Sequence, residues 1–330
     1  MSSTVTTPET SPGSAPAPSF GNNLKASRSA LPSGDRVFEG LVAGAAGVIP
    51  LLAAAMLLLL AVASWTCFQE QGFGFFTTQD WDPVKEHFGM LAFAYGTLAS
   101  SAIALLTAGP IGVGIALAIT EFTKPKYREI AAWVVETLSA IPSVIFGLWG
   151  MFVMAPFMRA HIEPLLVHIP GPFFREAGTG LSLLTAGLVV GIMILPTVMA
   201  VCREVFNAIP ISMRESALAL GSTRWEAVRL AVLAPSTPGI IGALILGMGR
   251  ALGETMAVTM VIGNRAEIST NLLAPSDSLA SAIANQFAEA ASPGHLSALA
   301  ALGFVLFLIT MLLNMAARLL VWAVANRVRH

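Results

Sequence analysis

The sequence has few charged residues for its length. Only 11% of its 330 residues are Asp, Glu, Lys or Arg, and 55% are hydrophobic. A soluble domain carries about 25% charged residues, so this composition is typical of an integral membrane protein. The formal net charge is −1 and no run of basic residues occurs, which argues against strong nucleic-acid binding.

Residues that bind metals or nucleotides are also scarce. The two cysteines, Cys67 and Cys202, lie in different apolar segments without CxxC spacing, so they predict neither a disulfide nor a metal site. His161 and His168 have no other ligand-like residue in their loop segment. None of the four lysines stands in a GxxxxGK[ST] motif, so any ATP must be bound by another chain. We expect no cofactor, metal or catalytic residue in this chain.

Six long apolar segments are present instead, and each is long enough to cross a membrane. A spanning helix needs about 20 residues. We predict spans over residues 41–67, 91–120, 130–157, 181–202, 238–262 and 296–324. The predicted fold class is an all-α integral membrane protein, with a six-helix transmembrane domain over residues 37–330. Residues 1–36 are rich in Ser, Pro, Thr and Ala and predict a disordered tail.

The basic residues are distributed unevenly between the two sides of the predicted membrane domain. An even number of spans places both termini on one side, and that side carries 13 of the 18 Lys and Arg residues. The other side carries Lys85, Arg159, Arg175 and Arg265, and Arg250 lies inside a span. Because basic residues are enriched in cytoplasmic segments, we predict that both termini are cytoplasmic.

A polar segment, residues 203–236, separates the fourth and fifth spans. Its mixture of apolar and charged residues suits two short helices. Gly221 predicts a turn between them, because glycine tolerates a positive φ, and Ser222 and Thr223 supply a hydroxyl cap for the second helix. On the predicted topology this segment is cytoplasmic.

The same segment contains a spaced motif. Glu215, Ser216 and Ala217 are followed four residues later by Gly221, with a leucine and a proline near residue 235. The motif resembles the EAA coupling loop of bacterial ABC importer permeases, although Ser216 replaces the first alanine and the ending at residues 231–235 is altered. The resemblance implies docking on a separate ATPase subunit. The alternative is an amphipathic hairpin without a dedicated partner.

The fifth predicted span contains two ionisable residues, in the sequence GMGRALGETMAV. Arg250 and Glu254 are four residues apart, which predicts that they share one face of the helix. Arg250 follows Pro238 by about 12 residues, on the order of 18 Å along a helix, which is near the middle of the bilayer. A charge there is costly and normally faces a cavity or a partner. The pair is therefore either part of a transport route or a structural ion pair.

Glu136 is a further ionisable residue in the third predicted span, six residues before Pro142. It lies within two turns of the predicted cytoplasmic end of that span. It is therefore a candidate for the transport route, with an interfacial or packing role as the alternative.

Three stretches narrow the resemblance to the PstC family, the permease subunits of bacterial phosphate ABC importers: TTQDWDPVKEHFGMLAFAYGTLASS, ETLSAIPSVIFGLWG and GRALGETMAV. The resemblance covers about residues 37–325. It implies a type I ABC importer permease fold in the bacterial inner membrane, and phosphate passage at Arg250 and Glu254. It also implies a PstA-like second permease subunit, a PstB-like ATPase dimer and a PstS-like extracytoplasmic phosphate-binding protein as partners.

The physical chemistry of an arginine suits this function. Phosphate accepts several hydrogen bonds, and guanidinium offers a planar, permanently charged set of donors. One arginine binds the anion weakly, which a transport route requires for release. Two alternatives remain: a permease for molybdate or sulfate, and a secondary transporter with Glu136 and Glu254 as a proton relay. The second alternative leaves residues 203–236 unexplained.

Overall fold

The computed structural model describes residues 33–176 and 178–328. By its internal contacts the chain divides into two units, Met1–Met56 and Leu57–His330. The described part of the first unit belongs to helix α2 (Ser33–Ala63), which continues into the second unit. Helix α2 begins inside the segment predicted to be a disordered tail, so that prediction is wrong for residues 33–36. The rest of the predicted tail, residues 1–32, lies outside the described residues.

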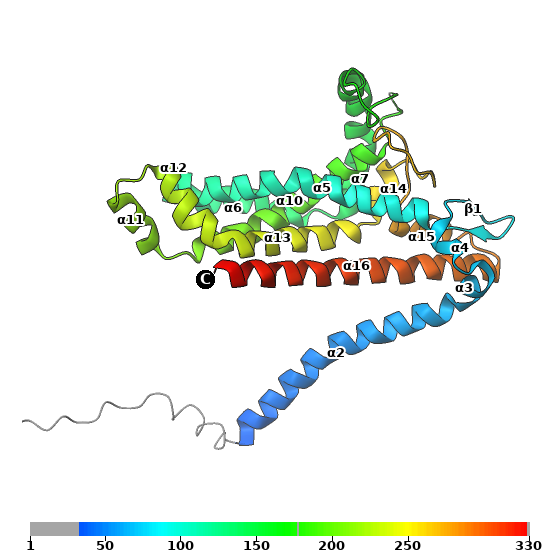
Figure 1. The fold of residues 1–330 in the computed structure, drawn as a ribbon, viewed down its shortest axis with the longest axis horizontal. Helices are drawn as coiled ribbons and strands as arrows, with labels where there is room; N and C mark the ends of the chain where they lie inside the picture. Colours follow the sequence, from blue (N-terminus) through cyan, green and yellow to red (C-terminus); the bar gives the residue numbers. More distant parts are fainter. Residues whose placement is uncertain (1–32, 177, 329–330) are drawn as a thin grey trace, which may run out of the picture. The chain divides into compact units, whose positions relative to one another are not determined.

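The second unit is drawn in Figure 1, and its regular secondary structure among the described residues is helical apart from one short hairpin. The hairpin pairs β1 (Trp81–Asp82) antiparallel with β2 (His87–Phe88). The α-helices are α3 (Trp65–Gln71), α4 (Gly74–Thr77), α5 (Leu91–Leu117), α6 (Pro125–Thr137), α7 (Ser143–Trp149), α8 (Ala155–Phe157), α9 (Glu163–Leu166), α10 (Leu183–Asn207), α11 (Ile211–Ala219), α12 (Arg224–Ala227), α13 (Ala234–Leu252), α14 (Met256–Val261), α15 (Leu279–Gln286) and α16 (Pro293–Val328). Short π- or 3₁₀-helical stretches connect or extend them: η2 (Ala118–Phe122), η3 (Leu138–Ala140), η4 (Gly150–Met154), η5 (Met158–Ile162) and η6 (Val228–Leu233).

Helix α10 is the centre of the second unit. It packs along α5 and α13, and α16 runs beside α13 (Figure 1). Two glycines allow the close approach of α10 to α5. An added Cβ would lie 2.5 Å from Ile103 at Gly187 and 2.6 Å from Thr107 at Gly191. Small residues at such contacts let membrane helices pack backbone to backbone.

Six helical segments among the described residues are long and apolar enough to cross a membrane. They are Val37–Ala63, Leu91–Phe122, Ser143–Leu166, Leu183–Asn207, Arg224–Leu252 and Pro293–Ala323. Each overlaps one predicted span, which confirms the prediction of an all-α, six-helix membrane protein. The bounds of the third and fifth spans differ from the prediction.

The third predicted span, residues 130–157, is not one helix. The chain leaves the helical conformation at Ile141, whose backbone is extended (φ −70°, ψ 125°), and a new helix begins at Ser143. Proline disfavours the α conformation of the residue before it, so Pro142 ends the first helix. The membrane-length segment therefore lies later, and His161, which was predicted to lie in a loop, is in η5.

The fifth predicted span, residues 238–262, is also interrupted. Helix α13 ends at Leu252, and α14 begins only at Met256. Glycine is a poor helix former, and Gly253 is the first residue beyond α13. The membrane-length segment instead starts upstream, at Arg224, and runs through α12, η6 and α13.

Candidate functional site

Arg250 lies in a hollow of about 390 Å³ between three helices. The hollow is lined by Thr197 of α10, by Ile245, Leu246, Gly249 and Arg250 of α13, and by Thr310 and Asn314 of α16. Arg250 Nη1 donates a hydrogen bond to Thr197 Oγ1 at 3.4 Å. The guanidinium therefore has hydroxyl and amide groups as neighbours in an otherwise apolar wall.

The polar residues of α16 are oriented by their own helix. Thr310 Oγ1 donates to the Leu306 carbonyl at 2.8 Å, and Asn314 Nδ2 donates to the Thr310 carbonyl at 2.9 Å. Such bonds to the preceding turn are usual for polar side chains inside a helix. They hold both side chains at the wall of the hollow, where they add polar groups beside the charge of Arg250. This set of groups suits a small oxyanion.

Glu254 does not share a helical face with Arg250. The helix ends between them, and Glu254 Oε1 accepts a hydrogen bond from the Ala257 N–H at 3.1 Å, in the first turn of α14. Both residues are described, and the structure has no ion pair between them. The prediction of one shared face is therefore wrong, because it assumed a continuous helix through Gly253. The alternative of a structural ion pair between the two also lacks its contact.

Glu136 lies in α6 and pairs with Arg203 of α10. Its Oε1 is 3.2 Å from Arg203 Nη2, which is also 3.3 Å from Glu204 Oε1. Arg203 follows Thr197 by six residues, or about 9 Å along α10. Glu136 thus joins α6 to α10 and does not line the hollow around Arg250.

Within residues 203–236, α11 is a separate short helix as predicted, whereas α12 is the start of a longer helical run that continues through η6 into α13. Helices α11 and α12 are joined at Gly221, whose φ is +85°, a conformation that favours glycine. The Thr223 side chain accepts from the Glu226 N–H, and Glu226 Oε2 accepts from the Thr223 N–H at 2.8 Å. This capping box fixes the start of α12. The predicted positive-φ turn and hydroxyl cap are both confirmed.

The outer surface of α11, α12 and the turn between them carries both polar and apolar side chains. Glu215 and Ser216 are exposed and Ala217 is half-buried. Large apolar side chains are exposed as well, with Leu220 at 90% and Trp225 at 55%. Exposed apolar side chains gathered beside polar ones are typical of an interaction surface.

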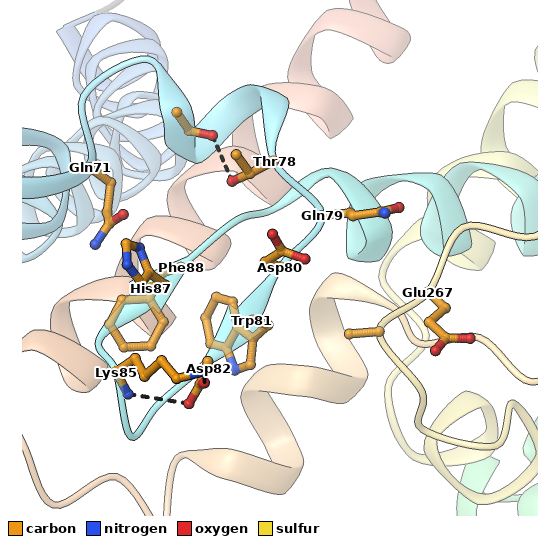
Figure 2. A pocket seen from close by; sticks show the side chains of 12 residues that line it. Gln71, Thr78, Gln79, Asp80, Trp81, Asp82, Lys85, His87, Phe88 and Glu267 are labelled. Atoms are coloured by element: carbon orange, nitrogen blue, oxygen red, sulfur yellow. Dashed lines mark hydrogen bonds and ion pairs between the residues drawn. The ribbon is translucent and has the colours of Figure 1, made fainter.

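A larger hollow, of about 570 Å³, lies beside the β1–β2 hairpin (Figure 2). Lys85 is on its wall, and Lys85 Nζ is 3.1 Å from Asp82 Oδ2. The hydrogen bonds from Lys85 lower the pKa of Asp82. Asp80 and Glu267 add negative charge to the same wall, so this hollow suits an oxyanion less well than the one at Arg250.

Three polar residues of the Arg250 hollow were missed by the sequence analysis. Thr197, Thr310 and Asn314 are uncharged, and each lies in a long apolar segment where single polar residues are common. Asn314 was detectable in principle, because it is an amide within the run MLLNMAARLL. Its closeness to Arg250 depends on how α16 packs against α13.

Six membrane-length helices among the described residues, with an exposed helical segment between the fourth and fifth, are the architecture of a multi-pass membrane protein. Residues 110–330 match the family model described as "Binding-protein-dependent transport system inner membrane component". The chain belongs to this family.

Curated relatives match most of the chain. It is 41% identical over 299 residues to the phosphate transport system permease protein PstC of Mesorhizobium japonicum, covering 89% of this chain and 91% of that protein. It is 44% identical over 283 residues to the protein of that name from Pasteurella multocida, covering 84% of this chain and 88% of that protein. The predicted resemblance to the PstC family is confirmed.

A solved structure with a similar fold is the MetNI methionine ABC transporter in an inward-facing conformation. One crystal form matches with a TM-score of 0.53 and 18% identity, over 70% of this chain and 93% of that chain. Another matches with a TM-score of 0.54. This likeness confirms the predicted ABC permease fold. A permease of this class is one subunit of a larger transporter.

Proposed function

We propose that this chain is the permease subunit of an ATP-driven importer of inorganic phosphate. The observation that carries the proposal is the hollow at Arg250, where a guanidinium lies beside the side chains of Thr197 and Asn314 between three membrane-length helices. The relatives named as phosphate permeases favour phosphate over molybdate or sulfate as the oxyanion.

In this proposal Arg250 binds the anion during its passage. Phosphate carries between one and two negative charges at neutral pH and accepts hydrogen bonds from a planar guanidinium, and Thr197 and Asn314 add neutral polar groups. A single charged contact keeps the affinity low enough for release. Glu254 contributes by accepting a hydrogen bond from the first turn of α14. This bond stabilises the start of α14 and therefore the break between α13 and α14.

Glu136 has a supporting role in the same proposal. Its ion pair with Arg203 holds α6 against α10, the helix that also carries Thr197. A proton relay through Glu136 and Glu254 is less well supported, because one carboxylate is ion-paired and the other caps a helix.

We further propose that residues 37–330 form the permease domain and that residues 203–236 are its coupling loop. Glu215, Ser216, Ala217 and Gly221 then contact an ATPase dimer, and both termini are cytoplasmic. A second permease subunit completes the route, and an extracytoplasmic binding protein delivers phosphate. The location proposed is the bacterial inner membrane. The exposed apolar side chains of α11 and α12 support the ATPase contact.

The test is reconstitution of the chain with its three partner subunits in vesicles. We expect ATP hydrolysis to be stimulated by the phosphate-loaded binding protein, and phosphate to be taken up with it. If the binding protein loaded with sulfate or molybdate stimulated ATP hydrolysis and the phosphate-loaded protein did not, the proposal of phosphate as the substrate would be wrong. Uptake driven by a proton gradient in the absence of ATP would replace the proposal with a secondary transporter.

A further inference from the structure

Arg214 of α11, within the proposed coupling loop of residues 203–236, forms four hydrogen bonds. Its Nε and Nη2 donate to Glu121 Oε1 at 3.1 and 2.9 Å. Its Nη2 also donates to the Phe206 carbonyl at 2.8 Å, and its Nη1 to the Ile209 carbonyl at 2.8 Å. The side chains of Arg214 and Glu121 are only 21% and 11% exposed, so the pair is shielded from solvent more than a surface ion pair is.

Two of these partners, Glu121 and Phe206, belong to the ends of two membrane-length helices, and Ile209 lies in the connection between α10 and α11. Glu121 is in η2, which continues α5, and Phe206 is in the last turn of α10. The last carbonyls of a helix have no partner within it, and a cation at that end interacts favourably with the helix dipole. The fork of a guanidinium suits several acceptors at once. Arg214 therefore fastens α11 to the ends of both helices.

Helix α10 leads from this link to the hollow at Arg250. Thr197, which accepts a hydrogen bond from Arg250, is nine residues before Phe206, or about 13.5 Å along the helix. Helices α5 and α10 pack closely along their lengths, so their ends are joined both by packing and by Arg214. Arg214, the ends of α5 and α10, and Thr197 thus form a continuous series of hydrogen-bonded and packed groups. A displacement of α11 can be transmitted to the hollow through them.

We propose that Arg214, held by Glu121, is the positioning residue that makes α11 move as one body with the ends of α5 and α10. Through α10 it transmits the movement of the coupling segment to Thr197 and Arg250. This inference rests on the proposed function, in which residues 203–236 dock on an ATPase. Without the link, α11 follows the ATPase while the membrane helices lag behind, and ATP is hydrolysed without transport.

The test compares variants of the complete transporter in vesicles. Arg214→Gln removes the charge and the fork, Glu121→Gln weakens the pair but leaves the carbonyl bonds, and Arg214→Lys keeps only the charge. Arg229→Gln is the matched control, since Arg229 is an exposed arginine in η6 of the same segment. ATP hydrolysis and phosphate uptake are measured in the same vesicles, and their ratio is the readout.

We expect Arg214→Gln to lower the phosphate taken up per ATP by about fivefold or more, in the range of ordinary coupling free energies. Glu121→Gln and Arg214→Lys should give smaller decreases, and Arg229→Gln none. A purely structural role would reduce hydrolysis and uptake together and leave their ratio unchanged. Wild-type ratios in both Arg214→Gln and Glu121→Gln would overturn the inference. If Arg214→Gln does not assemble, Glu121→Gln decides by the same criterion.

A second measurement does not depend on phosphate. Spin labels at Lys124→Cys and Ser212→Cys, both exposed positions, report the distance between the start of α6, just beyond η2, and α11 once Cys67 and Cys202 are replaced by Ala. We expect the same narrow distribution of distances with and without bound ATP, and a broad or shifted distribution after Arg214→Gln. An unchanged distance in that variant would refute the link. Absence of phosphate uptake by the wild type would refute only the proposed function.

Discussion

Arg250 of α13 donates a hydrogen bond to the Thr197 hydroxyl of α10, a residue 53 positions away in the sequence. The contact joins two membrane-length helices at a hollow that Asn314 of α16 also lines. It ties the charge of Arg250 to α10 and not to Glu254, which caps the next helix.

Arg250→Gln is expected to insert and assemble normally but to transport phosphate poorly. Hydrogen bonds to charged groups contribute about 1.5–3 kcal/mol, so uptake should fall by about 10- to 150-fold. Arg250→Lys should retain part of the activity, because it keeps the charge and loses the planar fork. Uptake and protein abundance are measured together.

The double variant Arg250→Gln with Glu254→Gln is the control for a structural role. Normal abundance together with normal phosphate uptake in that variant would show that Arg250 is not on the route.

Thr197→Val keeps the shape of the side chain and removes its hydroxyl. A neutral hydrogen bond is worth about 0.5–1.5 kcal/mol, so we expect a decrease of about 2- to 12-fold in uptake at unchanged abundance. Thr107→Val is the matched control, because Thr107 is a threonine of α5 that bonds to its own helix and does not line the hollow. Equal effects of the two substitutions would remove Thr197 from the site.

Gly221→Asp is expected to uncouple the transporter without preventing insertion. The residue has φ +85° with open space around it, and both Asn and Asp tolerate this conformation better than most residues. Gly221→Asn is therefore the matched control, since it differs from Gly221→Asp mainly in charge. We expect uptake to fall by about tenfold in Gly221→Asp and much less in Gly221→Asn. Uptake at the wild-type rate in Gly221→Asp would contradict a close ATPase contact here.

The predicted orientation can be tested by labelling single cysteines in intact cells. After Cys67 and Cys202 are replaced by Ala, a cysteine at the exposed Thr270 should react with an impermeant thiol reagent from outside. A cysteine at the exposed Lys124 should react only after permeabilisation. The opposite pattern would place both termini outside and contradict ATPase docking.

Asp277, in the connection between α14 and α15, predicts a dependence of stability on pH. Burial raises its pKa to about 6 from the ordinary 3.8, and bonds from Ser281 and Ser278 oppose the rise only in part. A folded-state pKa above the unfolded value means that the folded chain binds the proton more tightly. Stability should therefore increase as the pH falls from about 7 towards 4, by up to about 3 kcal/mol. Thermal unfolding of the purified protein at several pH values measures this, and Asp277→Asn should flatten the dependence.

The number and approximate location of the membrane helices were predictable from the sequence. Inside a bilayer every backbone polar group must be satisfied locally, so a long apolar segment has little choice but to form a helix. The turn at Gly221 and the cap at Thr223 were predictable for a similar reason. Both depend on the conformation of a few neighbouring residues.

The interruptions of the third and fifth spans were only partly predictable from the local sequence. The predicted third span ran through Pro142, but the structure has a full break there, with Ile141 extended. At Gly253 the helical pattern of apolar residues continues on both sides, and a glycine alone is often tolerated within a helix. The break there is accompanied by the cap from Glu254 to Ala257.

Composition and the spacing of local motifs determined the class of protein, the helices and the turn at Gly221, because these depend on interactions between residues close in sequence. Tertiary structure alone decided which polar groups meet. Arg250 with Thr197, and Arg214 with Glu121, are 53 and 93 residues apart. Long apolar helices have many nearly equivalent ways to pack, and glycines allow the close approaches found here, Gly187 and Gly191 between α10 and α5 and Gly247 between α13 and α10. That choice of packing brings the charges of this protein to their partners.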